Sequence, residues 1–195
     1  MFNELIIASH NQGKIQEFKQ ILSPFGVTIY SADDFNLPDV EETGTTFIEN
    51  ATLKAETLSS IIGKPCLADD SGLCVNALDG RPGVYSARYA PNRNFDKAMD
   101  KLIEEIKSTN TSDWSAYFAC VLALKEPGKE TKIFEGRVNG TITPHRKGEK
   151  GFGFDPVFIP NGFDRTFAEM TSDEKASISH RGQALKLFLQ REFNV

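Results

Sequence analysis

The sequence contains little that would suit export, a membrane span or bulk nucleic-acid binding. Its three cysteines, Cys66, Cys74 and Cys120, form no CxxC pair, so buried free thiols are expected in place of a disulfide or a thiolate metal site. No apolar run approaches the length of a membrane span, and no cleavable signal pattern opens the chain. The net charge of −5 gives no basic footprint for nucleic acid. We therefore expect a cytoplasmic protein with no nucleic-acid or membrane partner.

The chain also lacks internal repeats, low-complexity segments and linkers. Its 195 residues, of which 39% are hydrophobic and 25% are charged, are enough to build one substantial core. We therefore expect a single domain that spans residues 1–195.

Strand and helix patterns alternate along the chain, which predicts an α/β fold with a mixed, twisted sheet and flanking helices. The last two long strands are joined by a Pro-Gly turn, so they are expected to form an antiparallel hairpin. The pattern predicts strands at 4–8, 27–30, 66–68, 73–78, 114–125 and 131–141, and helices at 14–22, 46–62, 95–107 and from 179 onward.

The segment 68–72, with the sequence ADDSG, places two carboxylates side by side. It follows a short strand-prone stretch, and its Ser-Gly pair predicts a turn at the end of that strand. Adjacent carboxylates repel each other unless a cation binds there, and Mg²⁺ is the usual cation because it prefers hard oxygen ligands. The alternative is an Asx-type turn in which the aspartates satisfy loop amides. The rest of the chain favours the metal.

The segment 9–14, with the sequence SHNQGK, joins a predicted strand to a helix N-terminus, where free amides and the helix dipole favour anions. Lys14 adds a positive charge, although the Walker spacing is absent. A polar connecting loop is the alternative. In the next helix, Asn50 and Lys54 are four residues apart and project from one face. Together these elements predict a phosphate site.

Aromatic rings in the segment 151–156, GFGFDP, could stack on a planar base. Alternatively, Phe152 and Phe154 belong to the core, because alternate residues of an extended segment share a face. The segment 179–182, SHRG, begins the last helix, where the dipole disfavours the cation of Arg181. A residue placed against local preference is a hint of function.

These motifs occur in one order and cover nearly the whole chain, which resembles the inosine triphosphate pyrophosphatase family of RdgB-type dITP/XTP pyrophosphatases. The resemblance implies two lobes around a central active-site cleft and a homodimer. It also implies Mg²⁺-dependent hydrolysis of ITP, dITP and XTP to monophosphate and pyrophosphate, which cleanses the nucleotide pool. The motifs that carry it are SHNQGK, EETG with TFIENA, ADDSGL, PGVYSARY, GFGFDPVF and EKASISHRGQAL.

The same resemblance implies residue roles. Asp70 matches a metal ligand and proton acceptor, and Glu41 matches a second metal carboxylate, with Asp69 and Glu42 as neighbours. Phe152 is the expected stacking ring, and Phe154 stands where relatives often carry Tyr or Trp. The residues that match phosphate and sugar contacts are Ser9, His10, Asn11, Gln12, Gly13, Lys14, Lys54 and Ser71, and those that match nucleoside contacts are Phe152, Gly153, Phe154, Asp155, Lys175, His180 and Arg181.

Two other functions remain open at this point. A Maf-type nucleotide pyrophosphatase would catalyse the same reaction on other bases. A nucleotide-binding protein without turnover is disfavoured, because binding a polyanion does not call for acids beside the phosphates. No nucleophile with an adjacent base is evident in the sequence, so we expect water to attack the α-phosphorus without a phosphoenzyme.

Overall fold

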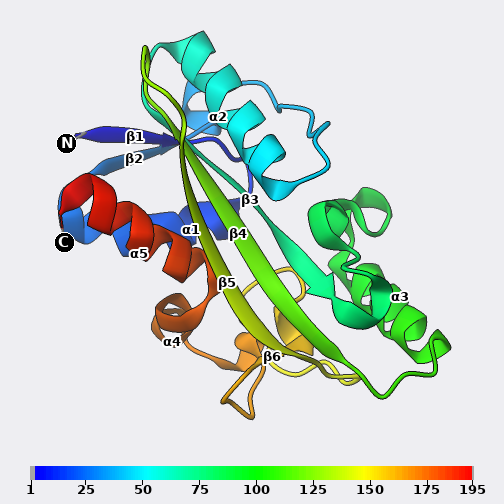
Figure 1. Ribbon diagram of the computed structural model, residues 1–195. Coiled ribbons are helices and arrows are strands. Elements are labelled where there is room, and N and C mark those ends of the chain that lie inside the picture. Colours follow the sequence, from blue (N-terminus) through cyan, green and yellow to red (C-terminus); the bar gives the residue numbers. More distant parts are fainter. Residues whose placement is uncertain (1–2, 195) are drawn as a thin grey trace. The chain divides into compact units, whose positions relative to one another are not determined.

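The computed structural model describes residues 3–194 and shows an α/β architecture (Figure 1). Short 3-10 helices connect many of its elements. No helix in the described residues is both long and apolar enough to cross a membrane. The strands are β1 (Glu4–Ile7), β2 (Thr28–Ser31), β3 (Cys66–Val75), β4 (Ser115–Lys125), β5 (Lys132–Ile142) and β6 (Phe158–Pro160), and the α-helices are α1 (Gln12–Leu22), α2 (Phe47–Ile62), α3 (Phe95–Ser108), α4 (Ser172–Ile178) and α5 (His180–Phe193).

The strands form one mixed sheet in the order β2-β1-β3-β4-β5-β6. Strand β1 pairs in parallel with both β2 and β3, whereas β5 and β6 are antiparallel. The neighbouring strands β4 and β5 are joined by residues 126–131 only, which is too short for a parallel crossover. The mixed sheet with flanking helices and the β4–β5 hairpin are therefore confirmed.

The residues divide into two compact units. Unit 1 comprises the described residues of 1–70, 120–136 and 181–195, and unit 2 comprises residues 71–119 and 137–180. Strand β3 passes from unit 1 to unit 2 between Asp70 and Ser71. Each unit has its own hydrophobic core.

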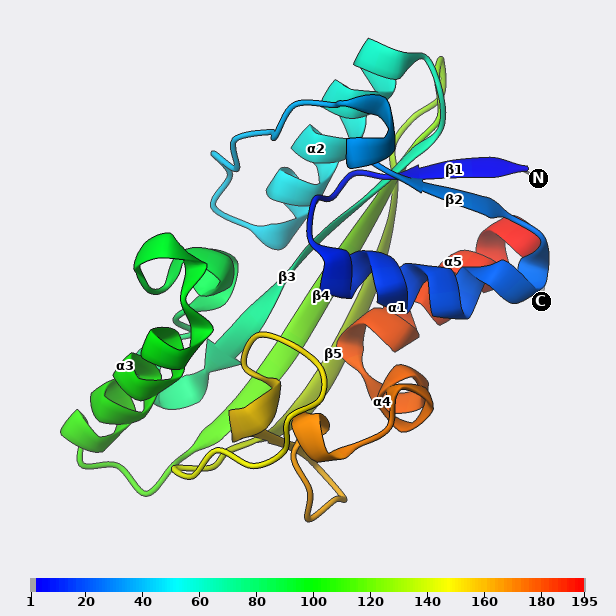
Figure 2. The ribbon, with the colours of Figure 1, turned by 180° about the vertical axis from the view of Figure 1, so that it is seen from behind.

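In unit 1, helices α1 and α5 lie on one side of the strands and α2 lies on the other (Figure 2). Alternate residues of the strands pack against these different helices. Leu5 and Leu67 lie in one core cluster with α1 and α5, whose buried residues include Phe18 and Phe188. Residues one position further along the same strands lie in a second cluster with the buried face of α2. This follows from the period of two in a β-strand, and it leaves both faces of these strands covered.

Helix α2 begins with the capping box that its sequence predicts. Thr46 accepts a hydrogen bond from the backbone of Glu49, and Glu49 accepts one from the backbone of Thr46. Such a cap satisfies two amides that the first turn would otherwise leave free. The cap fixes the start of the helix that carries Asn50 and Lys54.

Unit 2 is built around a core cluster that helix α3 shares with β4 and β6. Leu102 and Ile106 of α3 are fully buried in it, together with Phe158. Phe118 of β4 packs edge-on against Phe158, with ring centroids 4.8 Å apart. This core supports the segment that contains the GFGFDP motif.

One sequence prediction about the elements was wrong, and two elements were not predicted. Strand β3 runs without interruption from Cys66 to Val75, so the ADDSG segment lies inside a strand and not in a turn at its end. Strand β6 and helix α4 were not predicted, although a capping box formed by Thr171 and Glu174 opens α4. At only seven residues, α4 is too short for a clear 3.6-residue apolar period.

Candidate active site

Asp69 and Asp70 lie on opposite faces of β3, because successive side chains of a strand alternate. Both side chains are nearly inaccessible to solvent, at 1% and 4% exposure. The carboxylates therefore meet different partners, which removes the mutual repulsion that their adjacency suggests. A continuous strand can hold both for this reason.

The carboxylate of Asp69 is surrounded by donors. Arg181 Nε lies 2.9 Å from Asp69 Oδ2, Cys120 Sγ lies 3.1 Å from the same oxygen, and Lys14 Nζ donates to Oδ1. Burial acts to raise the pKa of Asp69, but Arg181 and Lys14 outweigh it and hold the pKa well below its usual value. Asp69 is thus fixed as an anion within a paired cluster.

Arg181 shares its guanidinium between two carboxylates. Its Nη1 donates to Glu17 Oε2, while its Nε donates to Asp69. Glu17 and Lys14 are three residues apart on α1, so they share a helix face. These acids offset the unfavourable position of a cation in the first turn of α5, and they engage the side chain that the sequence hypothesis directs at a purine base.

The carboxylate of Asp70 faces Lys54 of α2. Lys54 Nζ lies 3.9 Å from Asp70 Oδ1 and 2.6 Å from Glu42 Oε1, and it also donates to the Asp69 carbonyl at 2.8 Å. Burial raises the pKa of Asp70 to about 6; Lys54 opposes this shift and Glu42 adds to it. Asp70 is therefore an acid whose ionised form is disfavoured by its surroundings.

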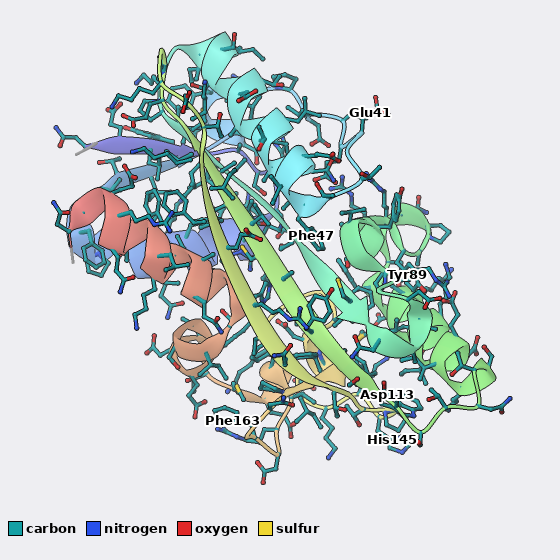
Figure 3. The ribbon with its side chains drawn as sticks, in the orientation of Figure 1. Glu41, Phe47, Tyr89, Asp113, His145 and Phe163 are labelled. Atoms are coloured by element: carbon teal, nitrogen blue, oxygen red, sulfur yellow. The ribbon has the colours of Figure 1, made fainter. Side chains whose placement is uncertain are left out.

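The loop before α2 brings Glu42, and not Glu41, to this cluster. Glu42 is half-buried and forms an ion pair with Lys54. Glu41 is exposed on the loop before α2 (Figure 3). Gly44 donates its backbone N–H to Asn50 Oδ1 at 2.8 Å, and a Cβ there would lie 2.6 Å from the Glu49 Cβ. Only glycine permits this close approach of the loop to the helix.

No group of three or more His, Cys, Asp or Glu side chains suited to a metal occurs within residues 3–194. Asp70 and Glu42 are nevertheless two carboxylates on either side of one lysine ammonium. Mg²⁺ is commonly held by one or two carboxylates, with phosphate oxygens and water completing its shell. The donor set therefore fits Mg²⁺ together with a phosphate ligand.

The loop 9–14 opens α1 with several internal contacts. Asn11 Oδ1 accepts the Lys14 backbone N–H at 3.2 Å, and Ser9 Oγ accepts the Asn11 N–H at 3.1 Å. Asn11 and Gln12 are exposed, and Gly13 is half-buried in the first turn. His10 Nδ1 donates to Asp33 of the segment after β2. The loop therefore presents a helix N-terminus next to the lysine that holds Asp69.

In unit 2, the side chain of Asp155 binds to the backbone of its own GFGFDP segment. Asp155 Oδ2 accepts the Phe152 backbone N–H at 2.9 Å and the Lys175 ammonium at 2.7 Å, and both charged side chains are buried. Gly151 has φ +73°, and a Cβ there would lie 2.1 Å from Asp155 Oδ2. The buried ion pair thus sets the conformation of this loop.

The two phenylalanines of this motif differ in exposure. Phe154 is 2% exposed and packs edge-on against Phe95, with ring centroids 5.6 Å apart. Phe152 is half-buried, and Lys175 Nζ lies 4.7 Å from its ring centroid. The core alternative that the sequence left open therefore applies to the Phe154 ring, and Phe152 is the ring left accessible.

The other predicted nucleoside residues also lie in unit 2, apart from Arg181. His180 is 5% exposed and stacks on Phe118, with ring centroids 4.7 Å apart and an interplanar angle of 10°. Gly153 has φ +68° and faces the Phe95 ring, and Ser71 is half-buried in β3. Phe152, Asp155 and Lys175 form one contiguous group, while Arg181 belongs to the ion cluster of unit 1.

Three residues of these clusters were missed or ranked low by sequence reasoning. Glu17 could have been found from the sequence, because it lies three residues after Lys14 on the same face of a helix. Glu42 was named only as a neighbour of the metal carboxylates, although it is the glutamate that contacts Lys54. Asp33 has no local signal, because it reaches the loop 9–14 through strand pairing.

Comparison with known proteins places these motifs in one family. The Ham1 family model matches residues 5–191. The chain is 49% identical to a dITP/XTP pyrophosphatase of Bacillus subtilis over 188 residues, covering 95% of both chains, and 51% identical to that of Bacillus licheniformis, covering 94% of both.

Solved structures agree with these relatives. A HAM1 protein from Coxiella burnetii matches with a TM-score of 0.90 and 39% identity, covering 98% of this chain and 99% of that one. The Staphylococcus aureus Ham1 protein matches with a TM-score of 0.84 and 44% identity, covering 97% and 99%. With the whole fold and nearly the whole sequence matched, the chain belongs to the Ham1 family.

Proposed function

We propose that the protein hydrolyses non-standard purine nucleoside triphosphates, namely ITP, dITP and XTP, to the nucleoside monophosphate and pyrophosphate. The observation that carries this proposal is the buried Asp70 beside Lys54 and Glu42, in a chain whose relatives are named dITP/XTP pyrophosphatases. A buried acid with a raised pKa beside a cation is typical of a site for chemistry.

Asp70 is the proposed proton acceptor. With a pKa of about 6, it is mostly ionised at neutral pH and still basic enough to take a proton from an attacking water. No covalent intermediate is required, because water itself attacks the α-phosphorus and pyrophosphate leaves. The charge of the departing pyrophosphate is then stabilised by lysine ammonium groups and loop amides.

Asp70 and Glu42 are the carboxylates that would hold Mg²⁺, and the resemblance adds Glu41. A bound Mg²⁺ would offset the charge of the triphosphate and lower the pKa of a coordinated water. The burial that raises the pKa of Asp70 supports this assignment, because a cation next to a buried carboxylate relieves its cost.

The triphosphate is assigned to residues of unit 1. Lys54 and Lys14 supply ammonium groups, and the loop 9–14 supplies backbone amides at the start of α1. For Lys14 to bind phosphate, it must leave Asp69. Asp69 would then keep its bonds to Arg181, so this exchange does not leave a buried carboxylate unpaired.

The purine base is assigned to residues of unit 2. Phe152 is the accessible ring, and Lys175 and His180 carry donors that suit an oxygen at the six position. Adenine presents an amino group there, so a donor would face a donor at a cost of about 1–3 kcal/mol per unmet bond. The proposed ranking is ITP, dITP and XTP above GTP, and GTP above ATP. We also infer a homodimer, from the resemblance alone, and a cytoplasmic location, which is consistent with the buried free cysteines.

The direct test is chromatography of the products after incubation with ITP and Mg²⁺. IMP and pyrophosphate as primary products, without IDP, support the proposal. IDP and orthophosphate as primary products contradict it, and a substrate panel of ITP, XTP, GTP and ATP tests the ranking. Light scattering that reports a monomer of 21.6 kDa would contradict the homodimer.

A further inference from the structure

Strand pairing in unit 1 brings Asp33 to the loop 9–14. Strands β1 and β2 are parallel, with Ile7 paired to Ser31, so the segments that follow them leave the sheet at the same edge. Asp33 begins the short 3-10 helix after β2. A residue 19 positions away from Lys14 in sequence thus lies against the start of α1.

Asp33 contacts two side chains of this loop with its two carboxylate oxygens. Oδ1 accepts a hydrogen bond from His10 Nδ1, and Oδ2 accepts one from Gln12 Nε2 at 3.4 Å. An ionised carboxylate can only accept, so Nδ1 is the donating nitrogen of His10. The two contacts lie on either side of Asn11, whose side chain caps α1.

These contacts contribute little to the stability of the fold. The Asp33 side chain is 51% exposed and that of His10 is 32% exposed, and such surface pairs are worth about 0–1 kcal/mol. The next residue is different, because Asp34 accepts hydrogen bonds from the Ser31 backbone N–H at 2.7 Å and from its hydroxyl at 2.9 Å. Asp34 binds within its own turn, whereas Asp33 contacts a neighbouring loop.

We propose that Asp33 is a positioning residue for the phosphate-binding loop 9–14. The inference rests on the proposed function and adds a residue to it. By holding His10 and Gln12, Asp33 keeps the loop amides in the arrangement that accepts phosphate, so less ordering is required when the triphosphate binds. The charge of Asp33 by itself would act in the opposite sense, because a carboxylate near a polyanion repels it.

The contacts of Asp33 with the loop should favour phosphate binding, whereas its charge should disfavour it. The direction in which Asp33→Asn changes KM therefore tells the two effects apart. The amide keeps the size of the side chain but cannot accept both hydrogen bonds. We expect KM for ITP to rise about 3- to 10-fold, with kcat within about two-fold, because an interaction that orders the loop for binding is lost. An unchanged or lower KM overturns the inference. The melting temperature should stay within about 2 °C of wild type.

Glu4→Gln is the matched control. It removes the same charge from another exposed ion pair of unit 1, in which Lys64 Nζ lies 2.9 Å from Glu4 Oε2. At equal ionic strength its KM should equal that of wild type. If Glu4→Gln raises KM as much as Asp33→Asn does, the effect is one of net charge, and the positioning role is wrong.

A double-mutant cycle tests whether Asp33 acts through the loop. In a His10→Ala/Gln12→Ala background, which lacks both contacts of Asp33 with the loop, Asp33→Asn should raise KM by less than it does when the loop is unchanged. Full additivity overturns the inference, because it means that Asp33 acts by another route.

Calorimetry with inorganic pyrophosphate gives a readout that does not depend on turnover. Wild-type protein should bind pyrophosphate more tightly than Asp33→Asn. Wild type that binds pyrophosphate but does not cleave ITP contradicts the proposed function alone, and the comparison with Asp33→Asn then decides the inference. Wild type that does not bind pyrophosphate overturns the inference.

Discussion

The two sides of β3 in unit 1 hold their carboxylates in opposite ways. Asp69 is compensated by Arg181 and Lys14, which keep its pKa well below the usual value. Asp70 is buried without equal compensation, and its pKa is raised to about 6. Similar burial thus accompanies a lowered pKa on one face and a raised pKa on the other, which indicates that the position of the cations decides the ionisation of each aspartate.

The largest expected difference between the two aspartates is in their effect on kcat. Asp70→Asn removes the proposed proton acceptor and proposed metal carboxylate, so kcat should fall by about 10²- to 10⁴-fold. Steady-state kinetics with ITP at saturating Mg²⁺ checks this. Near wild-type activity would mean that another acid serves as the base.

Asp69→Asn should act mainly on stability. Removing one partner from a buried ion cluster leaves Arg181 and Lys14 without their shared anion, at a cost of about 3–5 kcal/mol. Urea unfolding of the metal-free protein measures the loss in free energy of unfolding. A variant as stable as wild type would show that the cluster contributes no net stability.

Asp70→Asn should have the opposite effect on stability, with a particular pH dependence. Because the folded-state pKa of Asp70 lies above its unfolded value of 3.8, the native state binds its proton more tightly, and stability falls as pH rises from about 4 to about 6. Above that window, the asparagine variant should be more stable by about 1–3 kcal/mol. Unfolding in EDTA at pH 4 and pH 7 tests this, and a variant that is less stable at pH 7 contradicts it.

A smaller difference should separate the two glutamates of the EETG motif. Glu42 contacts Lys54 next to Asp70, whereas Glu41 lies exposed. Glu42→Gln should therefore lower kcat/KM by about ten-fold and Glu41→Gln by less. Mg²⁺ titrations of both variants measure the effect. A larger loss for Glu41→Gln would show that the loop rearranges when metal and substrate bind.

Arg181→Ala tests the cation that compensates Asp69. The sequence hypothesis places this side chain on the base, so the preference for ITP over ATP should flatten. Its contacts with Asp69 and Glu17 indicate a loss of stability as well. Equal loss for all nucleotides, after correction for the folded fraction, would assign Arg181 to the ion cluster and not to the base.

The sequence predicted those elements whose signals are local. The cap of α2, the buried face of α5 and the end of α1 depend on residues within one or two turns of each other. The interruption of β3 was predicted wrongly, because local rules assign Ser-Gly to turns. Local rules could not take account of Lys14 and Arg181, which compensate the charge of Asp69 from helices α1 and α5.

The sites were predicted unevenly for the same reason. The resemblance supplied the motifs, and Asn50 and Lys54 follow from helix spacing. Glu17, Glu42 and Asp33 depend on which helices and loops meet around the parallel strands. Such contacts are tertiary, and no window of a single sequence contains both partners.

The uninterrupted course of β3 restricts how this segment can change in evolution. Inserting or deleting one residue just before Asp69 would move every later side chain to the other face of the strand. Asp69 would then meet Lys54, and Asp70 would meet Arg181. A substitution changes one side chain at a time, but a one-residue change in length between Cys66 and Asp69 exchanges the faces of the two aspartates at once. Sequences of this family should therefore keep the length of this segment constant.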